Sequence, residues 1–116
     1  MVKKERNFKT IICGILNRRY GKKAIIAEED VVDNDKNRWT FMQVLQTLDP
    51  REAATLVAYD FCNKSFRQVG AMFGLSGNRV MQIRSKAYRK LRHPVRSRRI
   101  INFLKEDVAN AVKEVL

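Results

Sequence analysis

Apolar residues recur at helical spacing along most of the 116-residue chain. Between residues 6 and 16 they occupy the i, i+3, i+4, i+7 and i+8 positions of an amphipathic helix, and Gly21 follows as a stop signal. Residues 21–37 lack a sustained period and are expected to form a connector with a short turn around residues 27–32. The helical spacing returns over residues 39–48 and predicts a second helix. Its apolar set is Trp39, Phe41, Met42, Val44, Leu45 and Leu48.

A strong start signal marks a third helix. Asp49 suits the N-cap, Pro50 suits the first helical position, and Glu52 stands where its carboxylate reaches back to the cap amide. Residues 62–64 are expected to end this helix. Its expected buried residues are Ala53, Leu56, Val57 and Phe61.

Two more helices are predicted on either side of a glycine turn. Ser65 and Gln68 repeat the capping pattern and open a short helix over residues 66–73. Gly74 stops that helix, and Ser76 is placed to cap a fifth one. Two helices joined by a tight glycine turn form a helix-turn-helix.

The fifth helix has two contrasting faces. Its apolar face is formed by Val80, Ile83, Ala87 and Leu91. Its opposite face carries Asn78, Gln82, Ser85 and Arg89, flanked by Met81 and Lys86. We therefore expect one side to pack inward and the other to face a partner.

The helical pattern resumes after Pro94 and predicts one continuous helix from Ser97 to the end of the chain, packed on its own domain. Its apolar stripe is Ile101, Leu104, Val108, Ala111, Val112 and Val115. The predicted fold is all-α, a small helical bundle with a helix-turn-helix in its C-terminal half. We expect residues 1–38 to form an N-terminal helix plus an acidic connector, and residues 39–116 to form the helix-turn-helix domain with its C-terminal helix.

The composition indicates one folded domain, with 45% hydrophobic residues, 5 Gly and 2 Pro. No apolar run approaches the roughly 18 residues of a membrane-spanning helix. The N-terminal region also lacks the apolar stretch of a secretory signal, so we expect a cytoplasmic protein without a membrane partner. Cys13 and Cys62 have neither metal-ligand nor disulfide-framework spacing and are expected to be buried free thiols.

The charge is concentrated in one block. Residues 61–105 contain twelve Lys and Arg and no Asp or Glu, whereas the other 71 residues hold twelve side chains of each sign. A basic face that serves solubility alone does not explain why acids are excluded over this block. A one-signed field attracts a polyanion, and phosphate contacts release counterions condensed on nucleic acid. Nucleic acid is therefore the expected partner.

The helix-turn-helix carries side chains suited to double-stranded DNA. A helix fits the major groove, which is roughly 12 Å wide, and amides such as those of Gln82 and Asn78 pair there with base edges. The helix starts at Ser65 and Ser76 are expected to offer backbone amides to phosphates. Charge for the phosphates comes from Arg67, Arg79, Lys86 and Arg89.

The stretch from Ser65 to Pro94 resembles region 4 of bacterial sigma-70 factors without a gap. Its most specific part is Gln82-Ile83, followed by Lys86-Ala87, the run from Arg89 to Pro94, and Arg96-Ser97. The run from Leu48 to Ala53 is similar to the start of the preceding subregion. The resemblance extends over residues 39–104, and the short segment 59–65 is similar to that of alternative sigma factors.

This resemblance implies a transcription initiation module. It implies that the domain docks on the flap of the RNA polymerase beta subunit and places its fifth helix in the upstream (−35) promoter element. Arg51, Phe66, Arg67 and Lys86 match family positions at or near the DNA backbone, and Gln82 matches a base-contacting position. Arg89 matches a surface position that activators often touch.

Three positions depart from primary sigma factors. Gly77 and Asn78 stand where those factors have base-reading Arg and Glu, and Met81 replaces a further DNA-facing Arg. Loss of a bidentate Arg costs about 1–3 kcal/mol of base discrimination. We therefore expect that the protein prefers another promoter sequence, discriminates less between sequences, or relies more on polymerase to position it on the promoter. The candidate DNA-binding residues are Arg51, Ser65, Phe66, Arg67, Ser76, Gly77, Asn78, Arg79, Met81, Gln82, Ser85, Lys86 and Arg89.

The 38 residues ahead of Trp39 are too few for the strand-opening domain that acts at the −10 element. We therefore expect either half of a split sigma factor, with a separate subunit supplying −10 recognition, or a small phage-like or mobile-element regulator.

Two other classes stay open. One is a repressor or activator that dimerises through its terminal helices and does not bind polymerase. The other is a basic protein that binds nucleic acid without sequence preference. An enzyme is not expected, because one His beside Pro94, no paired carboxylates in the basic block and no glycine-rich phosphate loop leave nothing to organise a reaction. No catalytic residue, metal, cofactor or small-molecule substrate is expected.

Overall fold

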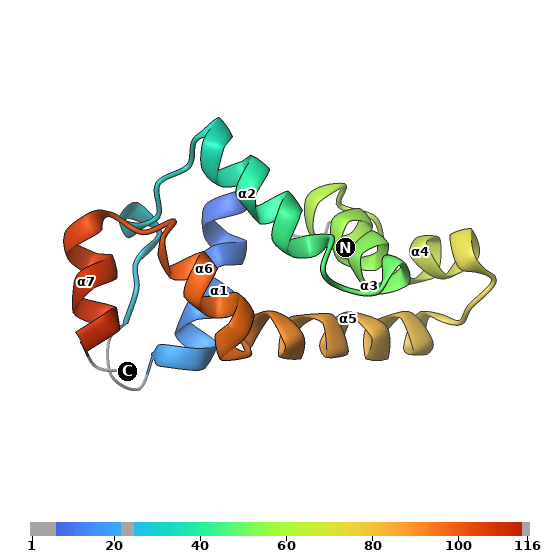
Figure 1. The fold of residues 1–116 in the computed structure, drawn as a ribbon. Coiled ribbons are helices and arrows are strands. Elements are labelled where there is room, and N and C mark those ends of the chain that lie inside the picture. Colours follow the sequence, from blue (N-terminus) through green and yellow to red (C-terminus); the bar gives the residue numbers. More distant parts are fainter. Residues whose placement is uncertain (1–6, 22–24, 115–116) are drawn as a thin grey trace.

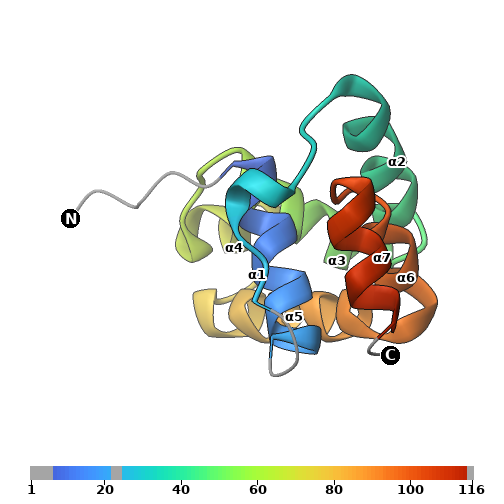
Figure 2. The same ribbon diagram turned by 90° about the vertical axis from the view of Figure 1, so that its left-hand side faces the viewer.

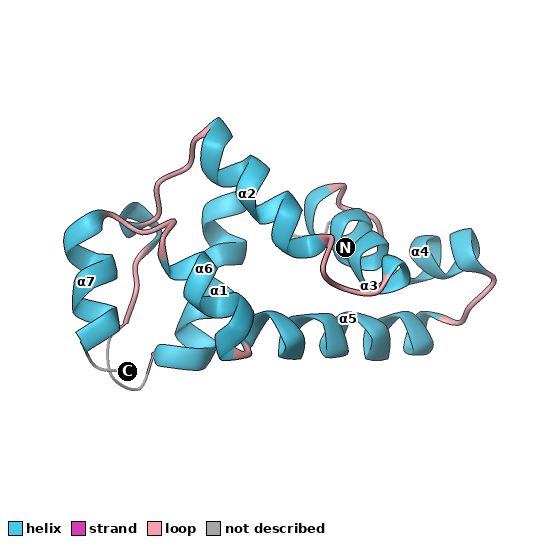
Figure 3. Ribbon diagram, viewed as in Figure 1, coloured by secondary structure: helices cyan, strands magenta, loops and turns pink. Residues whose placement is uncertain are grey.

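The computed structural model describes residues 7–21 and 25–114, and these are mostly helical (Figures 1 and 3). In chain order the elements are α1 (Phe8–Tyr20), the 3-10 turn η1 (Glu28–Asp30), α2 (Asp35–Leu45), α3 (Pro50–Leu56), the π-helical turn η2 (Val57–Phe61), α4 (Phe66–Phe73), α5 (Gly77–Arg92), α6 (Pro94–Ile101) and α7 (Glu106–Glu114). An isolated bridge pairs Val31 with Leu104, and no strand forms in the described residues. The all-α prediction is confirmed.

Buried apolar side chains form two clusters that α5 joins. The larger cluster unites α1, α2, α6, α7 and the C-terminal half of α5, where Ala87 and Leu91 are fully buried. The smaller cluster lies under the helix-turn-helix and is formed by Ala58, Val69 and Val80. Because α5 is one helix of 16 residues, about 24 Å long, it carries the helix-turn-helix on the same rod that the main core holds.

Helix α1 lies inside the larger core. Its apolar stripe is buried, with Ile11, Ile12, Ile15 and Leu16 all at 0% exposure, and α1 contacts both α5 and α6. The Tyr20 hydroxyl lies 2.7 Å from the Ser97 hydroxyl of α6 in a buried hydrogen bond. Figure 2 shows the C-terminal end of α1 beside α5. The N-terminal helix is therefore packed onto the helix-turn-helix unit.

Helix α2 begins earlier than the sequence predicts. The Asn34 side chain accepts a hydrogen bond from the Asn37 backbone N–H at 2.8 Å, so this residue caps the helix and α2 starts at Asp35. Four of its six predicted apolar positions are buried, but Trp39 is 65% exposed and Met42 is 44% exposed. These two members of the apolar set therefore lie at the surface.

The third predicted helix is α3 extended by η2. Leu56 is fully buried and Ala53 and Val57 are partly buried, as predicted, but Phe61 is 37% exposed. The Cys62 N–H donates to the Val57 carbonyl at 2.9 Å, five residues back. Such a π-helical turn holds one more residue than an α-helical turn, so residues after it leave the face that the 3.6-residue period predicts. This shift accounts for the exposure of Phe61.

The prediction of one continuous C-terminal helix is wrong. Helix α6 ends at Ile101 and α7 begins at Glu106, because the connector near residue 31 binds the backbone between them. The Val32 N–H donates to the Phe103 carbonyl at 2.8 Å, and the Lys105 N–H donates to the Asp30 carbonyl at 2.9 Å. Ala111 of the predicted apolar stripe is exposed, and Val115 lies outside the described residues.

Cys13 is buried and Cys62 is exposed, and both are free thiols. The predicted burial is thus right for Cys13 and wrong for Cys62, which follows η2 at the surface. None of the helices among the described residues combines the length and apolar character needed to cross a bilayer.

Candidate nucleic-acid interface

The turn between α4 and α5 depends on two glycines. Gly74 adopts φ +67°, a left-handed conformation in which a side chain is strained, and it ends α4. A Cβ on Gly70 would lie 2.3 Å from the Leu75 carbonyl oxygen, so only glycine admits this close approach. The Leu75 N–H donates to the Gly70 carbonyl at 2.8 Å. The predicted bend at Gly74 is confirmed.

Both helices of the turn start with the predicted serine caps. The Gln68 N–H donates to the Ser65 hydroxyl at 3.1 Å, and the Ser65 N–H donates to the Gln68 side-chain carbonyl at 2.8 Å. The Arg79 N–H donates to the Ser76 hydroxyl at 3.1 Å. Each serine hydroxyl is therefore occupied by its cap, and its structural role is to fix the start of its helix.

The two faces of α5 have the burial that the sequence predicts. Val80, Ala87 and Leu91 are fully buried, and Ile83 is 7% exposed. The outward side chains are all exposed, namely Asn78, Arg79, Met81, Gln82, Ser85, Lys86 and Arg89. Gly77, half-buried, is the first residue of this helix. A continuous polar and basic surface therefore covers the side of α5 that does not touch the core.

Gln82 has a partner in its own helix. Arg79 Nη1 donates to Gln82 Oε1 at 3.2 Å, three residues along the exposed face. An amide that reads adenine must accept and donate at once. To pair with a base, the Gln82 amide would have to give up its bond with Arg79.

The other candidate residues gather around the start of α4. Arg67 is exposed, whereas Phe66 is half-buried with its ring stacked on Tyr59 at a centroid distance of 4.1 Å. Arg51 of α3 is exposed, with its guanidinium 5.9 Å from the centre of the Phe73 ring. The structure therefore brings α3, α4 and α5 residues to one end of the molecule (Figure 1). In this group Phe66 supports the surface by packing, and Arg51 and Arg67 supply charge to it.

One residue that holds this surface in place is not indicated by any pattern in the sequence. Arg84 of α5 donates from Nε and Nη2 to the two carboxylate oxygens of Asp60, at 3.0 and 2.9 Å. Its guanidinium also lies 4.7 Å from the ring centres of both Tyr59 and Tyr88. Tyr59 stacks on Phe66, so this contact links η2, α4 and α5. Because the pair lies 24 residues apart in the chain, no periodic pattern indicates it.

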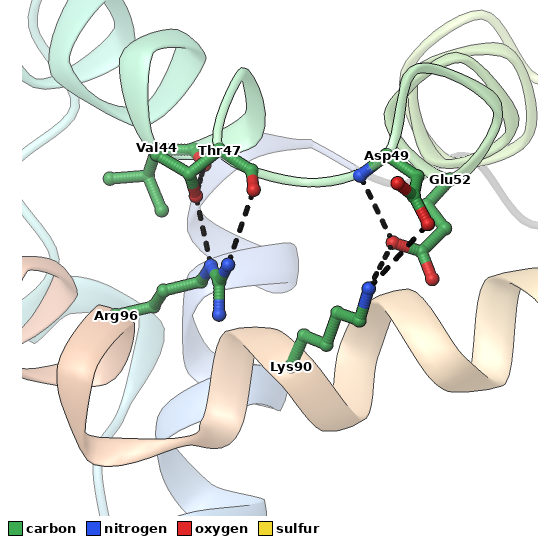
Figure 4. Close-up of polar contacts among 6 residues, drawn as sticks. All are labelled: Val44, Thr47, Asp49, Glu52, Lys90 and Arg96. Carbon is green, nitrogen blue, oxygen red and sulfur yellow. Dashed lines mark hydrogen bonds and ion pairs between the residues drawn. The ribbon is translucent and has the colours of Figure 1, made fainter.

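The turn between α2 and α3 is tied to the far half of α5 and to α6 (Figure 4). Lys90 Nζ lies 2.9 Å from Glu52 Oε1 and 3.7 Å from Asp49 Oδ2. Arg96 Nε donates to the Thr47 hydroxyl at 2.9 Å, and its Nη2 donates to the Thr47 carbonyl at 3.2 Å. Arg84 and Lys90 are therefore neutralised inside the molecule, and the basic block presents correspondingly less charge to a partner.

The sequence that forms this surface matches a known protein family. The family described as Sigma-70, region 4 matches residues 44–93. Residues 44–93 are a sigma-70 region 4 domain. This is a DNA-binding helix-turn-helix module of transcription, and the match covers α3, η2, α4 and α5 with the end of α2. The predicted resemblance is confirmed.

Two curated relatives are similar over this part of the chain. The RNA polymerase sigma factor SigA of Bacillus sp is 43% identical over 65 residues, which are 53% of this chain and 17% of that protein. The RNA polymerase sigma factor RpoD of Neisseria gonorrhoeae is 41% identical over 66 residues, which are 53% of this chain and 10% of that protein. The chain thus spans under a fifth of the length of either relative. No solved structure matches it.

Helix α1 lies outside the region 4 match, yet it supplies the centre of the larger core. Helices α6 and α7 also lie beyond the match and close over the same core. In this chain the region 4 domain is therefore braced by elements from both sides of it.

Proposed function

We propose that this chain binds promoter DNA through α5 and docks on RNA polymerase, as a region 4 module of transcription initiation. The observation that supports this most is the outward row of Asn78, Gln82 and Lys86 on a helix whose other side is buried through Val80, Ile83 and Ala87. A helix that is fixed along its back and polar along its front is suited to the major groove.

In this proposal the contacts divide by their chemistry. The exposed amides of Asn78 and Gln82, near the start of α5, read base edges, and the exposed thioether of Met81 makes an apolar contact such as that with a thymine methyl group. Arg51, Arg67 and Lys86 neutralise backbone phosphates on either side of the groove. Since Gly77 has no side chain to offer, the protein reads fewer base edges than a region 4 with Arg at that position.

The polymerase contact has a candidate surface away from the DNA-reading face. Met42 and Phe61, exposed at 44% and 37%, line a hollow of about 280 Å³ that reaches Phe8 and Phe41. Trp39, on the same helix as Met42, is 65% exposed. In Figure 1 α2 lies across the molecule from the free side of α5. DNA and an apolar protein partner would therefore not compete for the same surface. The names of both relatives, RNA polymerase sigma factors, favour polymerase as that partner.

We also propose that another polypeptide supplies −10 recognition and strand opening, and that the pair acts in the cytoplasm. The described elements outside the region 4 match support this, because α1, α6 and α7 pack their apolar faces into the region 4 core. They therefore offer structural support to the module and no independent strand-opening unit.

The test has a DNA part and a polymerase part. Selection of tight binders from a randomised duplex library is expected to enrich one short motif, and pull-down with purified core polymerase or isolated beta flap is expected to retain the chain. Binding to DNA without retention on polymerase would remove the docking half of the proposal. DNA binding without any enriched motif would favour the alternative of a basic protein that binds nucleic acid without sequence preference.

Oligomeric state separates the module from a dimeric repressor. The apolar stripe of α1 and residues Ala109 and Val112 of α7 are buried within the chain, so the described parts of the terminal helices offer no apolar dimer face. A monomer in sedimentation at micromolar concentration is therefore expected, and a stable dimer would favour the repressor.

A further inference from the structure

A second concentration of charge lies between α1 and α5, outside the proposed base-reading residues. Two adjoining hollows, of about 450 and 320 Å³, share the side chains of Arg18, Arg89 and Arg92 in their walls. Arg18 comes from the last turn of α1, and the other two come from the last turns of α5. Three guanidinium groups from two helices thus line one recess.

Among the described residues these three arginines have no ion-pair or hydrogen-bond partner, unlike Arg84 and Lys90 nearby. Burial lowers the pKa of the half-buried Arg92, and the charges of Arg18 and Arg89 lower that pKa further. Arginine side chains in proteins are protonated at neutral pH, so three like charges lie together here. The recess is therefore a place of mutual repulsion that a bound anion would relieve.

The recess continues the DNA-facing row of α5. Positions 78, 82, 85, 89 and 92 are spaced by four and three residues, which keeps them on one side of a helix. Gln82 and Arg92 are separated by about 15 Å along the axis of α5, at 1.5 Å per residue. A DNA backbone that contacts α5 at Gln82 can therefore extend along the helix to the recess at Arg92.

We propose that Arg18, Arg89 and Arg92 form a phosphate-binding recess that grips the DNA backbone beside the sequence read by α5. This inference rests on the proposed DNA binding and adds to it a contact from α1, which lies outside the region 4 match. Arginine suits this role because its planar donors bind phosphate oxygens in pairs. The N-terminal helix thus widens the DNA footprint of the module.

A purely structural role for these arginines makes a different prediction. Both α1 and α5 end beside the recess, and basic residues in the last turn of a helix interact favourably with the helix dipole. In that case, removal of Arg18 lowers the melting temperature and leaves the salt dependence of DNA binding unchanged. Thermal melting and DNA binding of the same variants therefore separate the two roles.

The experiment measures binding to a random-sequence duplex of about three helical turns, roughly 30 bp, by fluorescence anisotropy from about 50 to 200 mM salt. Arg18→Ala and Arg92→Gln are each expected to flatten the log-log slope by about 0.9, the value for one phosphate. Arg18→Lys is expected to keep most of the slope, because it keeps the charge. Circular dichroism melting checks that each variant is folded.

Arg99→Ala is the matched control. It removes the same charge from an exposed position on α6 that lines neither hollow, and its slope is expected to stay near that of the parent chain. Equal slopes for Arg18→Ala, Arg92→Gln and Arg99→Ala would overturn the recess. If Arg18→Ala keeps the salt slope of DNA binding but is no longer retained on polymerase, the recess binds an acidic protein surface. That result would also overturn the proposed phosphate contact.

The Lys86→Ala variant distinguishes failure of the phosphate-binding recess from failure of the proposed DNA binding by α5. If Lys86→Ala flattens the slope and Arg18→Ala does not, DNA binding by α5 stands and only the recess fails. If the parent chain does not bind the duplex at all, the proposed function fails and the recess fails with it.

Discussion

Arg84 and Asp60 form a bidentate ion pair, with N–O distances of 2.9 and 3.0 Å, that ties the middle of α5 to η2. The Asp60 carboxylate is fully buried and the Arg84 side chain is 21% exposed. Burial alone would lower the pKa of the Arg84 guanidinium, but its hydrogen bonds to Asp60 and the Asp60 charge raise that pKa overall. The Arg84 guanidinium therefore stays charged, and its two bonds to Asp60 hold the helix-turn-helix against the segment that precedes it.

Breaking this pair is expected to cost more from one side than from the other. Arg84→Met removes the guanidinium that balances a fully buried carboxylate, and such a change costs about 3–5 kcal/mol of unfolding free energy. Asp60→Ala leaves the guanidinium between two tyrosine rings with access to water, and is expected to cost less. Urea denaturation of both variants measures the difference. Equal losses of unfolding free energy in the two variants would show that an unpaired Asp60 carboxylate costs no more than an unpaired Arg84 guanidinium.

Gln82→Ala and Lys86→Ala are expected to affect DNA binding in different ways. The first removes a base-reading amide, so sequence preference falls more than overall affinity does. The second removes a phosphate contact, so binding to all duplexes weakens and the salt slope falls by about one unit. Competition between the selected duplex and random duplexes separates these effects. Identical behaviour of the two variants on every duplex would contradict the division of roles on α5.

Gly77→Arg is expected to strengthen DNA binding. A Cβ at this position would lie 3.6 Å from the nearest atom, Phe66 Cβ, which is ordinary van der Waals contact, so a side chain fits. The new guanidinium would stand at the start of α5, next to the exposed Asn78, and add about one unit to the salt slope. Gly74→Arg serves as the contrasting variant. It introduces the same charge at φ +67°, where a side chain is strained, and is expected to lower stability instead.

Trp39→Ala combined with Met42→Ala is expected to reduce retention on core polymerase and to leave DNA affinity unchanged. Both side chains are exposed on α2, so their removal creates no core cavity and the melting temperature is expected to stay close to that of the parent. Phe41→Ala is the opposite case, because that ring is 1% exposed and its loss costs about 3–5 kcal/mol. Unchanged polymerase retention by the double variant would exclude this surface as the docking site.

The stability of the chain is expected to fall between pH 9 and 11 through Cys13. Burial, and then the charges of Glu28 and Asp30, raise the pKa of this thiol from 9.0 to about 11. In the unfolded chain the thiol ionises above pH 9, whereas in the folded chain it stays protonated, so rising pH favours unfolding across this window. Unfolding midpoints measured at pH 8 and pH 10.5 for the parent and for Cys13→Ala isolate the effect.

Cys62→Ala is the control for that measurement, because its thiol is exposed. This variant is expected to keep the full alkaline loss, whereas Cys13→Ala is expected to lose part of it. Alkylation at pH 8 followed by mass measurement gives an independent check, since one thiol per folded chain should react. Rapid double labelling of the native protein would show that Cys13 is not protected.

The local signals in the sequence were sufficient for the helix-turn-helix. Ser65 with Gln68, Gly74, and Ser76 act over three or four residues, and the alternation of Val80, Ile83 and Ala87 with the polar side of α5 follows from helical geometry alone. These features do not depend on how distant segments pack. For the same reason, the exposed candidates for DNA contact could be named before any fold was known.

Tertiary structure decided the features that join distant segments. The break between α6 and α7 exists because residues 30–32 bind the backbone of residues 103–105. The apolar periodicity of the C-terminal segment contains no information about a partner so distant in the sequence. The exposure of Trp39 and Phe61 depends likewise on which helix faces are covered by α1 and on the π-helical turn.

The sequence by itself determined the helices, the glycine turn and the chemistry of the outward face of α5, because each is fixed by interactions within one or two helical turns. Only the tertiary structure decided that Arg84 faces Asp60 and that Arg18 stands beside Arg92. Those pairings join residues 24 and 74 positions apart, and their geometry follows from how the packed helices cross.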